Sequence, residues 1–224
     1  MSLIGLHIYI AFKIKGLLPQ KKNFFLTLII GIILPESDCI IIPLYNLLLN
    51  TGNNIPLFNK SFTHSIITIS IIYLIFLVIY EIKKKEYIVH MAKGLILGMT
   101  INVLFDTLVR LGDINVFWPL PILTLNNFNY SIFTINIIMI LEFIFFRLAA
   151  HELIKLILND PSNTDGYIIK HLSHLMKLEL IFILLMIFIM IYFNSIAINI
   201  FNLFYIISYS IILCILFNFI KKYN

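Results

Sequence analysis

The sequence is short of charge for its length. Only 12% of its 224 residues are Asp, Glu, Lys or Arg, whereas a soluble domain carries about 25%. Hydrophobic residues make up 61%, and the mean hydropathy is +1.01. So few charges cannot cover a soluble surface of this size, which excludes an ordinary soluble enzyme; the hydropathy also excludes a disordered tail and a coiled coil. The composition predicts a polytopic α-helical membrane protein.

Cysteine is scarce as well. Cys39 and Cys214 lie far apart in apolar stretches, so we expect neither a disulfide framework nor a thiolate metal site. The 16 basic residues outnumber the 11 acidic ones, but they do not form the arginine-rich pattern of a protein that reads a nucleic-acid groove. We therefore expect no nucleic-acid partner and interpret the lysines as signals of membrane topology.

Long apolar runs predict the helices. A transmembrane helix needs about 20 residues. Runs near or above that length cover residues 65–80, 88–108 and 131–147, and a run over 180–220 is long enough for two helices. Segments 3–15 and 24–34 are too short and predict a hairpin of short helices. We expect an all-α membrane bundle of about five long transmembrane helices plus this N-terminal hairpin. Residues 1–224 then form one membrane domain, with motifs in 1–121 and hydrophobic helices in 122–224.

The lysines set the orientation of this bundle. Lys83, Lys84 and Lys85 follow the first long span, so that end is expected in the cytoplasm. On the resulting topology only Lys60 and Arg110, of sixteen basic residues, lie on the outer side. We therefore expect a multi-pass protein of the plasma (inner) membrane that contacts membrane lipids.

Polar residues gather at the predicted outer face. Four segments end there, and they carry the expected metal ligands His7, Glu36, Asp38, His64 and Asp106. Pro35 stops the second short helix, so that the following acids can point into a site from a loop. Histidines and carboxylates together suit a divalent metal, either zinc or a harder ion such as manganese or magnesium. Such an ion lowers the pKa of a bound water and polarises a phosphoryl or acyl oxygen.

These residues can be given roles, each beside a simpler alternative. Asp106 or Glu36 is the expected catalytic base that activates water. Lys60 and Asn102 are the expected substrate-binding residues; Lys60 would hold a phosphate, or is a simple interfacial lysine. Asp106 and Arg110, at a spacing of i,i+4, could instead form a plain ion pair. Only the coincidence of the segments on one face weighs against these alternatives.

The order of the segments resembles a known family. It looks like the membrane-bound, metal-dependent hydrolases of the YdjM type, also labelled LexA-binding inner-membrane-associated hydrolases. The resemblance covers residues 1–121 and is carried by His7, Gly31–Asp38, Asn59–Ser65, Gly98–Asp106, Gly112 and Phe117-Trp118-Pro119. A broader similarity to zinc-dependent phospholipase C proteins lies in residues 7–11 and the Pro-acid segment. Together they imply a hydrolase acting on a phosphoester or lipid-like substrate, a lipid or other small molecule, at the outer membrane boundary.

The departures from the family pattern keep other functions open. Glu36 replaces Asp, Lys60 replaces Arg, and Asn59 and Asn102 each replace a histidine. An amide oxygen is a weak, neutral ligand that suits a hard ion better than zinc. The main alternative is therefore a degenerate, non-catalytic membrane protein that binds lipid or a partner. A small transporter, using Asp106 and Glu142 in a polar pathway, is the third possibility.

Glu142 lies inside a predicted span, where a carboxylate is costly unless paired. We expect it either to hydrogen-bond a neighbour inside the bundle or to support the site.

Overall fold

The computed structural model describes residues 3–19, 22–37, 62–110, 113–126, 128–159 and 166–192. Most of these residues are helical, which confirms the all-α class. The helices are α1 (Ile4–Ile14), α2 (Lys22–Ile33), α4 (Ile66–Lys83), α5 (Glu86–Val109), α6 (Ile132–Leu158) and α7 (Gly166–Tyr192). Short 3₁₀ turns, η1 (Lys15–Leu17) and η2 (Leu34–Ser37), extend α1 and α2. Strands β1 (Ile114–Asn115) and β2 (Thr124–Leu125) pair antiparallel, with Ile114 opposite Leu125.

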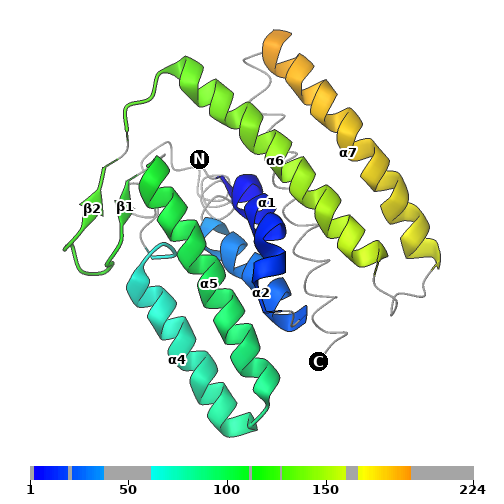
Figure 1. Cartoon of the computed structure of the whole chain (residues 1–224). Helices are drawn as coiled ribbons and strands as arrows, with labels where there is room; N and C mark the ends of the chain where they lie inside the picture. Colours follow the sequence, from blue (N-terminus) through cyan, green and yellow to red (C-terminus); the bar gives the residue numbers. More distant parts are fainter. Residues whose placement is uncertain are drawn as a thin grey trace, which may run out of the picture.

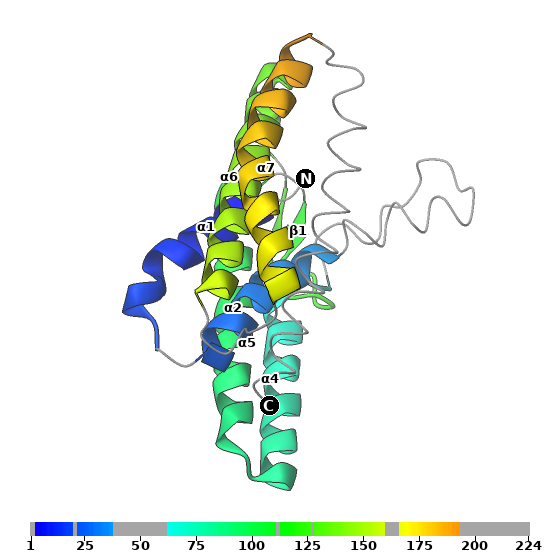
Figure 2. The same cartoon turned by 90° about the vertical axis from the view of Figure 1, so that its right-hand side faces the viewer.

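Two helical hairpins stand at opposite ends of the molecule. α4 pairs with α5, and α6 pairs with α7 (Figure 1). The short helices α1 and α2 lie between them, where α2 packs along α5 and α1 packs along α6 (Figures 1 and 2). Leu28, Ile29 and Ile32 of α2 are fully buried in the core that this arrangement creates. The two short apolar helices predicted at the N-terminus are thus present, and they serve as the centre of the bundle.

Local signals explain where α4 and α5 begin and end. Ser65 has extended backbone, and its hydroxyl accepts a hydrogen bond from Ile67 N–H at 3.1 Å, as an N-cap does. Lys84 directly follows α4 and Arg110 directly follows α5, and both of these residues adopt the left-handed conformation that closes many helices. Because α4 and α5 pair as a hairpin, the start of α4 and the end of α5 lie at the same end of it.

α4 and α5 are the two helices of the described residues that are long and apolar enough to cross a membrane. Their ranges agree with the runs predicted at 65–80 and 88–108. α4 exposes Ile71, Leu74 and Val78 by more than half of their surface, a distribution that suits contact with lipid. The last predicted span falls mostly in residues 193–224, outside the described residues.

The charge-free run that begins at residue 180 marks only part of a longer helix. α7 already begins at Gly166 and continues through the charged stretch that contains Lys170 and Lys177. A charge-free run reports which part of a helix is apolar, whereas a helix continues through polar residues for as long as its backbone bonds are made.

Candidate metal centre

One face of α5 packs against α2 through two glycines. A Cβ atom at Gly94 would lie 2.2 Å from the carbonyl oxygen of Phe24, and one at Gly98 would lie 2.1 Å from that of Leu28. Neither distance is possible for a real side chain, so only glycine allows the two backbones to approach this closely. The Gly-x₃-Gly spacing is a common device for close helix contact in membranes. It fixes the position of the end of α2 relative to α5.

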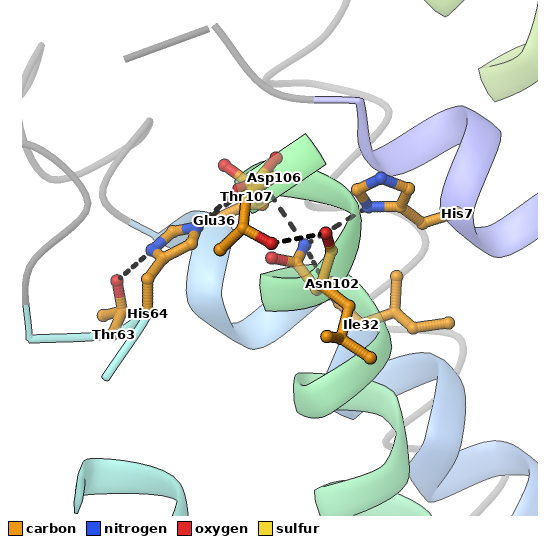
Figure 3. A network of polar contacts seen from close by, with 9 residues as sticks. His7, Ile32, Glu36, Thr63, His64, Asn102, Asp106 and Thr107 are labelled. Carbon is orange, nitrogen blue, oxygen red and sulfur yellow. Dashed lines mark hydrogen bonds and ion pairs between the residues drawn. The ribbon is translucent and has the colours of Figure 1, made fainter. Parts of the chain in front are cut away.

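Asn102 continues the same face of α5 and joins three helices. Its Nδ2 donates a hydrogen bond to the carbonyl oxygen of Ile32 in α2 at 2.9 Å. The same nitrogen lies 3.4 Å from Glu36 Oε1 and 3.4 Å from His7 Nδ1 of α1 (Figure 3). Asn102 is fully buried, and its Oδ1 has no hydrogen-bond partner among the described residues. The amide therefore holds the segment that carries Glu36.

Glu36, His64 and Asp106 meet where η2, the start of α4 and the end of α5 converge (Figure 3). His64 Nε2 lies 2.8 Å from Asp106 Oδ2 and 3.8 Å from Glu36 Oε1. The side chains are 0%, 1% and 2% exposed for His64, Glu36 and Asp106, respectively. One ligand atom from each residue lies within 4.8 Å of the others. We call this group the acidic triad.

The ring of His64 is oriented from its other nitrogen. Thr63 Oγ1 lies 3.0 Å from His64 Nδ1, which leaves Nε2 directed at the two carboxylates. Burial lowers the pKa of His64, but hydrogen bonds and charge from Asp106 and Glu36 outweigh it and raise the pKa to about 9. In the metal-free protein at neutral pH, the imidazole is therefore a cation that pairs with both carboxylates.

Glu142 holds the start of α1, and with it His7, beside the triad. The sequence only partly indicates this contact. Glu142 of α6 is fully buried, and its oxygens accept hydrogen bonds from Gly5 N–H at 2.7 Å and Leu6 N–H at 3.3 Å. These donors belong to the first turn of α1, where backbone N–H groups lack helical partners. The expectation that Glu142 hydrogen-bonds a neighbour inside the bundle is confirmed. His7 is the next residue, and its ring contacts that of Phe105 in a tilted arrangement, with 5.0 Å between the ring centroids.

The structure places the predicted site residues in three ways. Glu36, His64 and Asp106 come together, whereas His7 lies beside Asn102 at the edge of the group. Asp38 and Lys60 lie outside the described residues. The roles proposed for all of these residues stay predictions.

One signal in the sequence was missed. Gly94, Gly98, Asn102 and Asp106 follow one another at intervals of four, and that spacing on an apolar helix indicates a continuous row, first for packing and then for polar contacts.

The donor set of the acidic triad fits a divalent cation. Bonds of about 2.0–2.6 Å to one ion require ligand atoms within about 5 Å of one another, and the triad satisfies this. With a neutral His64, the two carboxylates supply a charge of −2, which one divalent ion balances. Comparison with protein-family models, curated proteins and solved structures finds no match for this chain.

Proposed function

We propose that this chain is a membrane-embedded, metal-dependent hydrolase whose metal is held by the acidic triad. The observation that carries the proposal is the burial of an imidazole and two carboxylates, from three separate segments, within 4.8 Å of one another. Burying carboxylates is expensive, and a folded chain keeps such a group where a counter-charge or a function compensates for it. The segment order shared with the YdjM-type hydrolases supports the same reaction class.

Each side chain has a task in this proposal. A divalent ion at the triad would lower the pKa of a water molecule and polarise a phosphoryl or acyl oxygen of the substrate. Thr63 Oγ1 would accept a hydrogen bond from Nδ1–H of His64, which keeps Nε2 available as a ligand. Asp106 or Glu36 would serve as the general base for the attacking water. Asn102 fixes Glu36 through its amide nitrogen.

The substrate class follows from the membrane placement that we propose. α4 and α5 cross the plasma membrane, within a multi-pass bundle of about five spans, and the triad lies at the outer end of their hairpin. A phospholipid or another amphiphilic phosphoester reaches such a site laterally, with its headgroup at the triad. The exposed apolar face of α4 supports this placement.

Metal analysis combined with a hydrolysis assay tests the proposal. The purified protein in detergent is dialysed against Zn²⁺, Mn²⁺ or Mg²⁺, its metal content is measured by plasma mass spectrometry, and release of phosphate-containing headgroup from phosphatidylcholine is followed. We expect one bound ion, and at least about tenfold weaker binding in His64→Ala and Asp106→Asn.

Matched controls remove the same groups from exposed positions. Glu86→Gln and His174→Ala change side chains that are exposed, so both should bind metal and turn over substrate like the unmodified protein. The proposal is rejected if the unmodified protein binds no divalent ion, or if the triad variants behave like these controls.

A second candidate is a non-catalytic relative that binds lipid or a partner. The observation in its favour is the use of Asn102 as a packing residue, with its amide donating to the backbone of Ile32. This candidate predicts neither a bound divalent ion nor hydrolysis of any phospholipid offered, so the same two measurements separate it from the first.

A further inference from the structure

The β1–β2 connection is exposed and contains no charged residue. Residues 114–125, here called the apolar hairpin, read Ile-Asn-Val-Phe-Trp-Pro-Leu-Pro-Ile-Leu-Thr-Leu. Ile122 is 70% exposed, Leu120 is 48% exposed and Trp118 is 37% exposed. Turns that face water are usually polar, and a cluster of large exposed apolar side chains indicates contact with an apolar partner.

The apolar hairpin is fixed to the residues on either side of His64. Ile66 N–H donates to the carbonyl oxygen of Val116 at 2.9 Å, and the Ser65 hydroxyl donates to that of Trp118 at 2.8 Å. The ring of Trp118 meets that of Phe62 edge-on at 5.2 Å. These contacts hold the hairpin against the start of α4, at the same end of the helical hairpin as the acidic triad (Figure 1).

The exposed surface continues from the hairpin onto α4. Ile66, in the first turn of α4, is 44% exposed, and exposed apolar residues follow along the helix at Ile71 and Leu74. Trp118 and the half-exposed Phe62 stand where this surface reaches the end of the helix. Tryptophan and other aromatic side chains are enriched at the membrane–water interface, where an amphipathic ring lies at the headgroup level.

We propose that the apolar hairpin inserts into the lipid leaflet at this end of α4 and α5, with Trp118 at the interface. The partner is the bilayer itself. Inserted in this way, the hairpin places the neighbouring His64 at the level of the lipid headgroups. The hairpin's position rests on the proposed membrane crossing by α4 and α5 and does not depend on hydrolysis.

Fluorescence of the unmodified protein tests this insertion directly, because Trp118 is the single tryptophan of the sequence. The protein is reconstituted into phosphatidylcholine vesicles whose acyl chains carry bromine either near the headgroup or near the chain end. We expect bromine near the headgroup to reduce Trp118 emission about twofold. Bromine near the chain end should reduce it less, and aqueous iodide should have little effect. Strong quenching by iodide without quenching by brominated lipid overturns the proposal, as does protection from both quenchers.

A second variant separates the hairpin from the membrane placement of α4. In the double variant Trp118→Phe, Leu74→Trp, the indole moves to the middle of α4, where Leu74 is 58% exposed. We expect deep bromine to quench this indole most strongly. If Leu74→Trp is quenched and Trp118 is not, the hairpin proposal alone is wrong. If neither indole is quenched by lipid, the proposed membrane crossing by α4 is wrong as well.

Discussion

Gly98→Ala should have two effects. It should move α2 away from α5, and it should weaken metal binding at the candidate centre. The added Cβ would lie 2.1 Å from the carbonyl oxygen of Leu28 and 2.8 Å from the backbone nitrogen of Ile32. A carbon and a carbonyl oxygen pack no closer than about 3.3 Å, so α2 must move away from α5 by roughly 1 Å. Such a movement lengthens the 2.9 Å hydrogen bond from Asn102 to Ile32 beyond a useful distance.

The change in the free energy of unfolding follows from two destabilising effects and one stabilising effect. Overpacking costs about 1–3 kcal/mol, and the lost hydrogen bond costs about 1 kcal/mol. Alanine returns about 1 kcal/mol because it favours helix more than glycine does. The free energy of unfolding should therefore fall by about 1–3 kcal/mol. Displacement of Glu36 should weaken metal binding about tenfold.

Reversible unfolding in mixed detergent micelles, followed by circular dichroism, measures the first quantity, and titration with Mn²⁺ measures the second. Gly16→Ala is the matched control, since a Cβ there meets nothing within 4 Å, and its stability should change by less than about 0.5 kcal/mol. Equal stability and equal Mn²⁺ affinity of the two variants would refute the close approach of α2 and α5 at Gly98.

Three further predictions concern the groups around the triad. Glu142→Ala removes the acceptor of two N–H groups in α1, so the free energy of unfolding in micelles should fall by about 1–3 kcal/mol; a loss no larger than that of the exposed Glu86→Gln contradicts this. Asn102→Ala should weaken Mn²⁺ binding about tenfold in a titration, because the amide positions Glu36; unchanged affinity would show that Glu36 is held by other contacts. A metal ion binds the imidazole of His64 only in its neutral form, and the pKa of His64 in the metal-free protein is about 9. Binding should therefore release one proton, and the apparent Kd should fall about tenfold for each pH unit until the pH reaches that pKa. Calorimetry in buffers of different ionisation enthalpy counts the proton, and an affinity independent of pH between neutrality and that pKa contradicts the assignment.

Local patterns in the sequence were enough to predict the helical class and part of the site. Long apolar runs predict α4 and α5 because the apolar length of a helix is a property of consecutive residues. Placing the ends of successive segments on alternate sides predicts that Glu36, His64 and Asp106 share one face, and the structure brings them together.

Contacts between distant helices could not be predicted in the same way. Glu142 and Gly5 are 137 positions apart, and nothing local to Glu142 states that its partner is the backbone of α1. The apolar hairpin could not be predicted either, for a related reason. Its Pro-rich, charge-free stretch has no period that distinguishes a short strand pair from a loop, and its position depends on Ser65.

The row of residues at Gly94, Gly98, Asn102 and Asp106 does not run straight along α5. Because an α-helix turns about 100° per residue, each step of four residues advances the row by about 40° around the axis. The glycines therefore face α2, and Asp106, rotated by about 120° from Gly94, faces His64 at the start of α4. Inserting one residue after Gly98 would rotate Asp106 by about 100° away from His64 while the glycine contacts persist. The number of residues between Gly98 and Asp106 is therefore fixed, because one residue more would turn Asp106 away from His64.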